Sequence, residues 1–591
     1  MTTLNEVLAR LTIQELKSLL HWVPHSTTPV KKDKLVGEIL QSLSGEGLRA
    51  HWELLDDTQR LAVAEAVYDI DGVFHANRFR AKYGRLPEFT VKNPGRFSSI
   101  ESPTALGLFL YLQDGYDRLP TDMRENLKTF VPEPEPARLN TIDMLPEMSD
   151  ENPLTVRNSE RDAIADLAVL LRLAGQGKIQ VSEKTSLPGS ATLRLLTETL
   201  AGGDFYSHQA KERSNDQEVG PLKAFSWPLL LQAAGLLQAN GSKVALSTAG
   251  VKALSSSPAS VLRAIWSKWL KSSLFDEFSR IDVIKGQKSK GRVMTALAPR
   301  RAVINQALKC CSVGAWITVD EFSRFMQATD QTFAVTHDRW KLYIEEQDYG
   351  HLGHAGYGTW ETLQLRYLLC FLFEYAATLG IIDVAYVDPR GARGDFSGMW
   401  GTDDLQFFSR YDGLVYFRLT PLGAYCLGLS EDYTVAAAQP GVRLSVLPGL
   451  QVNVVGGKLS TEEFMMLDTW SVEATKQSWR LDRGKALEAI EKGHDISELQ
   501  AFLQARDDQP LPETVESFIT TTRKKGKALT IKGTALLIDC DDAETAAMIA
   551  SRKEAAGLCL RAGDRQLVVR LEKEEKFRAL IRSLGVGITR S

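Results

Sequence analysis

The chain has 591 residues, of which 44% are hydrophobic, 24% charged and 8% aromatic. At about 100–200 residues per domain this length predicts roughly three to five domains, and the ordinary globular composition excludes wholesale disorder. The 70 Lys and Arg residues against 74 Asp and Glu residues give a net charge of −4, which excludes a uniformly basic nucleic-acid-coating protein, so any nucleic-acid surface must come from local clustering.

The sequence contains no feature that directs a chain into or across a membrane. Its first residues lack a cationic start followed by an apolar stretch, so we expect no secretory signal. The most apolar stretch, residues 367–375, is short and contains Glu374, which favours a buried helix over a membrane span. The six cysteines include no CxxC pair, and the adjacent Cys310 and Cys311 would pair poorly, so we expect a reduced, cytoplasmic protein.

Catalytic motifs are missing as well. Of the Gly-Lys pairs, none has both the upstream glycine and the following Ser or Thr of a phosphate-binding loop, and HExxH, GxSxG and GxGxxG do not occur. His337, His351 and His354 lie in a glycine-rich stretch without a thiolate pair, which favours a solvated loop over a zinc site. We therefore expect no catalytic residues, no metal and no cofactor.

Residues 1–45 predict a small helical module. Thr12 has the position of an N-cap, with Glu15 three residues further on, and a loop then leads to a second amphipathic helix. The order LTIQELKSLL…VKKDKLVGEILQSL resembles the SAP-type helix–loop–helix DNA-binding module. This resemblance implies that basic residues beside the second helix touch the duplex backbone, and a solvated helix start is the alternative. These residues are Lys31, Lys32 and Lys34.

Residues 46–130 predict a helical domain that carries the basic segment NRFRAKYGRLPEFTVKNPGR. Six cations and three aromatic residues stand there against one acid, a composition that suits phosphate contact and base stacking. The alternative is an interhelical loop whose aromatic side chains, Phe79, Tyr83 and Phe89, turn inward. The candidate DNA contacts are Arg78, Arg80, Lys82 and Arg85, with Lys92 and Arg96 beyond them.

Residues 131–153 are rich in proline and acid, and they predict an extended, self-repelling linker. Residues 154–256 then follow as helices, a short strand and the hairpin LLQANGSKVAL with its Asn-Gly turn, an order that predicts a winged helix. In such modules the helix before the wing enters the major groove and the wing touches phosphate. We expect contacts from Thr192, Arg194 and Lys243, and because the helix around residue 195 is rich in leucine, protein binding is the alternative.

Residues 257–430 predict a basic loop and a second winged helix. The endings KVALSTAGVKAL and YFRLTPLGAYCL share a strand, a Ser/Thr-x-x-Gly step and a helix, which indicates an internal repeat. Between residues 285 and 301 six cations meet no acid, which favours a phosphate grip, although solvated loops also accumulate lysine. These cations are Lys285, Lys288, Lys290, Arg292, Arg300 and Arg301.

Residues 440–591 carry an ordered series of features. The strand-like LSVLPGLQVNVV precedes a W-R-L strand with a helix after it, a helix in GHDISELQAFL, a helix after Pro512, a turn at KKG into a strand at 528–531, and the strand ALLIDCDD. This order resembles the helicase-associated domain that lies N-terminal to the motor in XPB/Ssl2-type DNA helicases and also occurs as independent bacterial proteins. The resemblance implies recognition of damaged or distorted DNA without catalysis, and this chain carries no motor sequence.

Within this region the basic run TRKKGK is the expected DNA-facing element, and a charged turn in solvent is the alternative. Trp470 and Trp479 are expected in the core, given the usual burial of tryptophan. The candidate DNA contacts are Lys524, Lys525 and Lys527, with Arg523 and Lys532 beside them.

The sequence as a whole predicts a multidomain, mainly α protein with small β-hairpins and sheets, of the α+β class. It combines a SAP-like module, tandem winged helices and an XPB-like terminal domain. The expected function is that of a non-catalytic DNA-binding accessory protein of a helicase or nuclease system, in repair, restriction or phage defence, with duplex or forked DNA as its partner. The alternative is a scaffold that docks a separately encoded helicase or nuclease and touches DNA little.

Overall fold

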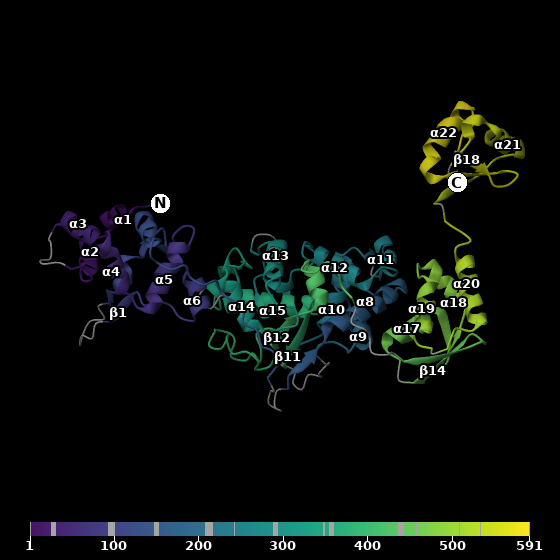
Figure 1. Cartoon of the computed structure of the whole chain (residues 1–591). Coiled ribbons are helices and arrows are strands. Elements are labelled where there is room, and N and C mark those ends of the chain that lie inside the picture. The colour runs from purple at the N-terminus through teal and green to yellow at the C-terminus, as the bar shows by residue number, and fades with distance from the viewer. Residues whose placement is uncertain are drawn as a thin grey trace. The chain divides into compact units, whose positions relative to one another are not determined.

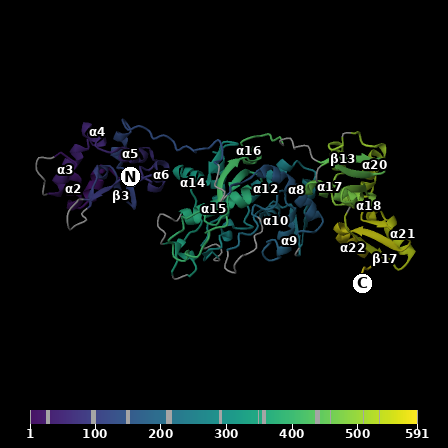
Figure 2. The same cartoon turned by 90° about the horizontal axis from the view of Figure 1, so that it is seen from below.

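A computed structural model shows a multidomain α+β protein in which helices predominate and the sheets are small and antiparallel (Figures 1 and 2). Within the part of the chain it describes, no helix is both long and apolar enough to cross a bilayer. The structure describes residues 2–24, 31–92, 101–146, 153–206, 217–241, 243–287, 293–346, 349–353, 360–434, 442–456, 459–507, 509–531 and 533–589.

Two compact units make up the chain. The first comprises Met1–Arg443 with Val454–Thr469 and Lys492–His494, and the second comprises the remaining residues from Leu444 to Ser591. The first unit contains an N-terminal helical domain and two similar copies of a helix-and-hairpin arrangement. We describe each unit separately.

The N-terminal helical domain begins as the sequence predicts. Thr12 caps the second helix: its hydroxyl accepts from the backbone N–H of Glu15 at 3.2 Å, and the Glu15 carboxylate accepts from the N–H of Thr12 at 2.7 Å. Leucines on the inner faces of these helices fill the core of the domain. The helices are α1 (Leu4–Arg10), α2 (Ile13–Leu20), α3 (Lys32–Ser42), α4 (Glu46–Glu53), α5 (Asp57–Tyr68), α6 (Ala76–Tyr83) and α7 (Thr121–Leu127), with short strands β1 (Thr90–Lys92), β2 (Glu101–Pro103), β3 (Tyr111–Gln113) and β4 (Tyr116–Arg118).

The acidic segment that follows is extended, as predicted, but its first half is not a free linker. Val131 is buried and its carbonyl accepts from the hydroxyl of Tyr68 at 3.0 Å. Ile142 pairs with Trp316 in an antiparallel bridge, with 2.9 Å between the Ile142 nitrogen and the Trp316 oxygen. Between these two anchor points the segment is extended and largely exposed, as the linker prediction has it, but it is held at both ends. Residues 147–152 lie outside the described ranges.

Two copies of one element order follow. Each copy has a helix, a short extended segment, a second helix, a third helix, a two-stranded hairpin and a closing helix. The first copy consists of α8 (Ser159–Gly175), α9 (Ser190–Thr199), α10 (Lys223–Ala233), β6 (Leu237–Asn240), β7 (Lys243–Leu246) and α11 (Thr248–Ala253). The second consists of α13 (Leu297–Leu308), β9 (Trp316–Thr318), α14 (Val319–Ala328), α15 (Leu365–Cys370) between the π-helical turns η5 (Trp360–Gln364) and η6 (Phe371–Ala376), β11 (Ile382–Tyr386), β12 (Leu414–Leu419) and α16 (Pro421–Leu427).

The two copies end in the same pattern of hydrogen bonds. Ser247 caps α11 by accepting from the N–H of Gly250 at 3.0 Å, and Thr420 caps α16 by accepting from the N–H of Gly423 at 2.8 Å. Each of these hydroxyls also donates to the carbonyl of a glycine with positive φ, at 2.6 and 2.7 Å respectively. The internal repeat expected from the sequence is present.

The glycine of this repeated ending gives a test of the fold. A Cβ on Gly423 would lie 2.0 Å from the backbone oxygen of Ile381, a contact that only a backbone shift can relieve. We expect Gly423→Ala to lower the free energy of unfolding by about 3 kcal/mol, at the upper end of overpacking costs. Gly37→Ala is the matched control, because nothing lies within 4 Å of its Cβ position in α3, and it should stabilise by up to about 1 kcal/mol. Equal urea midpoints for the two variants would contradict the close contact between Gly423 and the Ile381 carbonyl at this repeated ending.

The two copies share one hydrophobic core. Their third helices meet there: Ser226 of α10 donates to Thr378, just beyond η6, at 3.2 Å, and both residues are buried. β5 (Thr155–Arg157), which precedes the first copy, pairs with β11 of the second, so the larger sheet has the order β5-β11-β12-β9. α12 (Pro258–Trp269) packs against α8, α10 and α16 of both copies.

This shared core also holds paired charges. The guanidinium of Arg301 contacts the carboxylate of Glu277 at 2.6 Å, and neither side chain has any exposed surface. Arg366 and Asp412 form a second fully buried pair at 3.0 Å. Such pairs are tolerated because each partner compensates the desolvation of the other, so removal of either one is costly.

Residues 443–589 follow most of the predicted order. The sheets have the orders β13-β14-β16-β15 and β17-β19-β18. The predicted strand at 528–531 is wrong, because α20 continues through the good helix formers Lys524 and Lys525 to Gly526, and the next residues have no partner strand. The elements are β13 (Arg443–Leu447), β14 (Gln451–Gly456), α17 (Thr461–Trp470), β15 (Ser471–Thr475), β16 (Ser478–Leu481), α18 (Arg483–Glu491), α19 (Ile496–Gln504), α20 (Glu513–Gly526), β17 (Ala535–Asp539), α21 (Ala543–Ser551), β18 (Cys559–Arg561), β19 (Gln566–Arg570) and α22 (Glu574–Ser583).

A buried histidine makes the stability of the first unit depend on pH. Burial lowers the pKa of His494 to about 4, and the nearby charges of Arg172 and Lys492 contribute. Above pH 6.5 the imidazole is neutral in both states, but between about pH 6.5 and 4 the unfolded chain binds a proton that the folded chain does not, so stability falls with pH. At about 1.4 kcal/mol per pKa unit the loss approaches about 3 kcal/mol. Urea midpoints should fall less steeply with pH for His494→Gln than for the wild type, and parallel curves would contradict this assignment.

Candidate nucleic-acid interface

The first predicted cluster lies at the start of α3. Lys31 is the N-cap residue of this helix, and both it and Lys34 are exposed. The ammonium of Lys32 donates to the carbonyl of Ala9 at 2.7 Å, so this lysine ties the start of α3 to the end of α1. The cluster therefore leaves Lys31 and Lys34 on the surface and uses Lys32 within the domain.

The second cluster, on α6, is largely neutralised. Lys82 contacts the carboxylate of Glu65 at 2.6 Å, and Arg78 contacts that of Asp69 at 3.3 Å. Both acids come from α5 and its end, outside the basic segment, which is why the segment alone looks strongly positive. Arg80 and Arg85 are exposed. The side chain of Lys92 and the whole of Arg96 lie outside the described parts of the chain.

The aromatic residues of this segment turn inward. Phe79 is buried, with ring centroids 5.2 Å from Phe74 and 4.6 Å from Tyr83. Phe89 packs against Phe74 at 5.8 Å, and the Tyr83 hydroxyl donates to Glu65 at 2.8 Å. The expectation of base stacking here is wrong, because these rings fill the core under α6.

The helix before the first hairpin cannot enter a DNA groove. α10 packs against α9, α12 and η6, and Trp227, Leu229, Leu230 and Leu231 have no exposed surface. The expected contacts Thr192 and Arg194 lie on α9 and not on this helix. A helix that is apolar on every side is buried rather than displayed.

Among the candidates in the first copy, two remain on the surface. Arg194 is exposed on α9, and Lys243 is exposed at the start of β7, beside the hairpin turn. Thr192 is buried instead: its hydroxyl donates to the Gln180 carbonyl at 2.8 Å and accepts from the Gln180 N–H at 2.9 Å. Its assignment as a DNA contact is therefore wrong.

The basic stretch 285–301 divides into three parts. Arg300 and Arg301 are buried and paired with Asp276 and Glu277, at 3.0 and 2.6 Å, so their assignment to a surface patch is wrong. Lys285 is exposed on β8 (Ile284–Lys285), and its ammonium donates to the Asp282 carbonyl at 2.6 Å. The remaining candidates, Lys288, Lys290 and Arg292, lie outside the described residues.

The C-terminal cluster remains available. Lys524, Lys525 and Lys527 are exposed at the end of α20, and within the described ranges their side chains make no ion pair or hydrogen bond. Neighbouring Arg523 donates to the amide oxygen of Gln500 at 3.4 Å. Lys532 lies outside the described residues.

The charges of this cluster contribute to the lowered pKa of one carboxylate, that of Asp495. Asp495 caps α19, and the hydrogen bonds that it accepts from Ser497 lower its pKa, with Lys527 and Arg523 contributing. Trp470 and Trp479 are buried, as expected, so they offer no stacking platform. The C-terminal lysines thus act as surface charges held at a fixed helix end.

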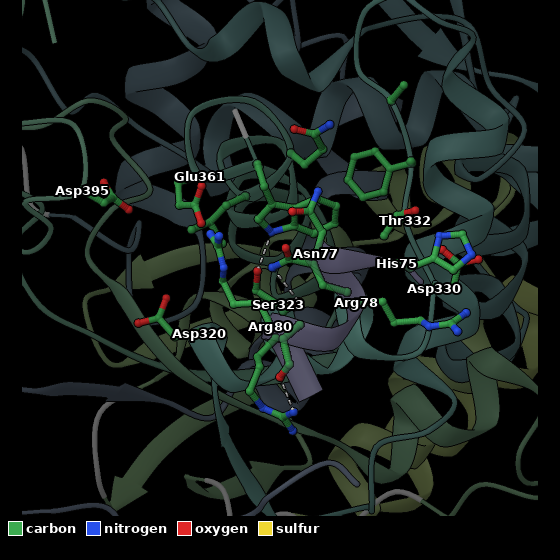
Figure 3. Close-up of a pocket in the computed structure, with 18 of the residues that line it drawn as sticks. His75, Asn77, Arg78, Arg80, Asp320, Ser323, Asp330, Thr332, Glu361 and Asp395 are labelled. Carbon is green, nitrogen blue, oxygen red and sulfur yellow. Dashed lines mark hydrogen bonds between the residues drawn. The ribbon is translucent and has the colours of Figure 1, made fainter. Parts of the chain in front are cut away.

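A cleft in the first unit was not predicted. It has a volume of about 1090 Å³ and lies where α6 packs against α14, with η5 beside them (Figure 3). Arg324 of α14 donates to the carbonyl of Ala81 in α6 at 2.9 Å and holds the two helices together. The residues that line the cleft include His75, Asn77, Arg78, Arg80, Asp320, Ser323, Arg324, Asp330, Phe333, Arg339, Trp360, Glu361, Gln364, Arg393 and Asp395.

Two acceptors on η5 have no hydrogen-bond partner within the part of the chain that the structure describes. They are one carboxylate oxygen of Glu361 and the amide oxygen of Gln364, and both atoms are shielded from solvent. Beside them, the indole N–H of Trp360 donates to the Ser323 hydroxyl at 2.8 Å. No sequence motif marks this site, since its residues come from four separate segments of the chain.

Metal binding finds no support among the described residues, where no group of three or more His, Cys, Asp or Glu side chains is placed to hold an ion. His354 of the glycine-rich stretch lies outside them. Comparison of the chain with protein-family models and with curated proteins gives no match. The resemblances to the SAP module and to the helicase-associated domain therefore remain predictions from the sequence.

Proposed function

We propose that this chain is a non-catalytic, cytoplasmic DNA-binding accessory protein of a helicase or nuclease system. In this proposal the second unit, similar in element order to the XPB-type helicase-associated domain, grips the phosphate backbone of duplex or forked DNA. The observation that carries the proposal is the exposed trio Lys524, Lys525 and Lys527.

The charge around this trio supports a phosphate grip. From residue 517 to residue 538 the sequence contains no Asp or Glu, whereas Arg523, the three lysines and Lys532 are all cationic. Cations near the last turn of a helix are stabilised by its dipole, so the fold tolerates their concentration there. Asp495 is close enough for Lys527 and Arg523 to contribute to its lowered pKa, but within the described residues it forms no ion pair with the three lysines, which can therefore displace the counterions of DNA.

We further propose that the two repeated copies are winged helices that contact DNA through their edges. Their order of helix, short extended segment, helix, helix and hairpin supports this assignment. Because α10 is buried, the contacts of the first copy would come from Arg194 and Lys243. The SAP-like module would add Lys31 and Lys34.

The direct test is binding of the full chain to fluorescently labelled duplex, forked and single-stranded DNA at low salt, followed by anisotropy. We expect retention of duplex and forked DNA, because the proposed contacts are to the backbone and do not depend on sequence. Failure to retain any of the three forms would refute the proposal.

The second candidate function is a scaffold that docks a separately encoded helicase or nuclease. The exposed apolar side chains of the second unit favour it: Leu529 and Ile531 are 93% and 94% exposed, and Leu537 and Leu560 are largely exposed on β17 and β18. The burial of α10 favours it as well. Under this alternative Leu529→Ser/Ile531→Ser would disrupt the assembly with the motor, whereas under the DNA-binding proposal the same variant retains its DNA affinity.

A further inference from the structure

We propose that an exposed aromatic patch of the first unit binds an arginine-rich segment of a partner protein. The patch consists of Trp340, Tyr349 and Trp400, which lie on the two sides of β10 (Tyr343–Ile344) and in the loop around residue 400. This binding is separate from the DNA contacts of the second unit. Three observations carry it: the exposure of the rings, their fixed placement and the charge around them.

The exposure of the aromatic patch is unusual for this chain. Trp340 and Trp400 are 50% and 49% exposed, whereas the other nine tryptophans, all within the described ranges, are buried or mostly covered. Tyr349 is 64% exposed. Tryptophan and tyrosine supply much of the binding energy where proteins meet, so a group of them left open to water marks a contact surface.

The rings of the patch occur in two neighbouring pairs. The ring centroids of Tyr349 and Trp400 lie 5.6 Å apart, with their planes inclined by 32°. Two residues after Tyr349, the ring of His351 lies 6.4 Å from that of Trp340. The segment 349–351 therefore connects both tryptophans, and a bound segment can contact them together.

Two glycines hold the tryptophan rings in place. The N–H of Ile344 donates to the carbonyl of Gly350 at 3.1 Å, which fixes this part of the backbone. A Cβ on Gly350 would lie 3.0 Å from Cε3 of Trp400, and a Cβ on Gly353 would lie 2.2 Å from Cδ2 of Trp340. Each ring thus lies directly on backbone without a side chain. Rings that are already oriented lose little conformational entropy when a partner binds.

The surroundings of the patch are acidic. Residues 338–353 and 397–404 contain six acids and two cations, a net charge of −4. One carboxylate lies close to Trp400, because Oε2 of Glu345 is 3.2 Å from the Cβ position of the adjacent Gly401. The acids that are exposed around the patch are Glu345, Glu346, Asp403 and Asp404.

Two lysines beside the patch are turned to acceptors of their own. The ammonium of Lys341 lies 3.9 Å from the carboxylate of Asp338. Lys285, opposite Tyr343 in the pairing of β8 with β10, donates to the carbonyl of Asp282 at 2.6 Å. A phosphate at the patch would meet exposed carboxylates and be repelled, whereas a cation would be attracted. The charge therefore favours a cationic partner over base stacking by DNA.

Arginine fits this combination of rings and carboxylates better than lysine. Its planar guanidinium stacks on an indole face and can pair with a carboxylate at the same time. The lysine ammonium is a compact, strongly hydrated charge that does not stack. We therefore expect the bound segment to be rich in arginine.

Fluorescence anisotropy of labelled peptides with the full chain tests this assignment. The peptides alternate glycine with arginine, with citrulline, which keeps the shape of arginine without its charge, or with glutamate. We expect the arginine peptide to bind at least about tenfold more tightly than the citrulline peptide, and the glutamate peptide not to bind. Equal affinity for the arginine and citrulline peptides, or no binding of the arginine peptide, would overturn the proposal.

Aromatic variants locate the binding surface. Tyr349→Ala and Trp400→Ala should each weaken binding of the arginine peptide about fivefold or more. The matched control is Tyr116→Ala, which removes a tyrosine that is 55% exposed on β4. Urea midpoints confirm that the variants remain folded. Unchanged affinity in both patch variants, or an equal loss in the control, would overturn the assignment.

Charge variants separate the local acids from the net charge of the chain. Glu345→Gln/Glu346→Gln should weaken binding of the arginine peptide, and Glu431→Gln/Asp432→Asn, which removes two exposed carboxylates elsewhere, should leave it nearly unchanged. Equal losses in these two variants would show that overall charge, and not the patch, attracts the peptide.

A thymidine oligonucleotide distinguishes the remaining occupant of such a surface. If Tyr349→Ala and Trp400→Ala weaken its binding to the full chain, the rings stack on bases and the proposal is wrong. The peptide results do not depend on Lys524, Lys525 and Lys527, so the DNA-binding proposal stands or falls separately.

Discussion

Glu277→Ala is expected to lower the free energy of unfolding of the first unit by about 3–5 kcal/mol, because Arg301 would remain in the core as an unpaired charge. The guanidinium is fully buried and also donates to the carbonyls of Ser272 and Phe275, at 2.7 and 2.8 Å, so it cannot swing out to water without breaking these bonds. Urea unfolding followed by tryptophan fluorescence reports on this region directly, because Arg301 lies over the ring of Trp269.

Two further variants separate the charge from the packing. Glu277→Gln keeps the shape and part of the hydrogen bonding, so its loss should be smaller than that of Glu277→Ala. Glu135→Ala removes one partner of an exposed ion pair, with Arg138 at 3.6 Å, and should leave the midpoint nearly unchanged. If Glu277→Ala unfolds at the same urea concentration as Glu135→Ala, Arg301 and Glu277 are not a buried pair.

Replacing Lys524, Lys525 and Lys527 together with glutamine is expected to produce the largest loss of DNA affinity. Three phosphate contacts at about 0.9 each should make the slope of log K against log salt shallower by about 2.7, and at about 0.1 M salt the affinity should fall by about 100-fold or more. Glutamine is a good helix former, so α20 itself should persist. Anisotropy titrations over a salt series measure both quantities.

The control for this variant changes charge without touching the cluster. Lys476, Lys553 and Lys576 are exposed elsewhere in the second unit, and their joint replacement with glutamine alters the net charge equally. Under our proposal this control retains most of the affinity and the slope. Equal losses in the two triple variants would show that total charge, not the end of α20, governs binding.

Local features of the fold could be predicted because neighbouring residues determine them. The cap at Thr12 depends on Glu15 three residues away, and the hairpin of β6 and β7 depends on its own turn. The repeated endings at Ser247 and Thr420 likewise involve only a short Ser/Thr-x-x-Gly step. Each of these features can therefore be predicted without knowledge of the tertiary structure.

The site predictions failed where a distant segment supplies the partner. In the sequence Arg301 has the character of a surface cation, but in the structure it is paired with Glu277. Lys82 is likewise paired with Glu65 of α5. The cleft has the same origin, because Glu361 and Arg78 belong to different domains of the first unit. Charge counts along a segment omit the acids that the fold brings to it.

The burial of α10 could be read from the sequence. The run around Trp227 is apolar on every side of a helix, which indicates a buried helix. At 528–531 the alternation of Leu529 and Ile531 resembles a strand, but a strand also needs a partner, and the described structure offers none. Periodicity alone does not decide such cases.

The salt dependence of duplex binding by the intact chain decides whether backbone contact underlies its function. With at least three phosphates neutralised by Lys524, Lys525 and Lys527, log K should fall against log salt with a slope of about −2.7 or steeper. A slope near zero, or no binding at the lowest salt concentration, would contradict the proposal and leave the scaffold as the better description.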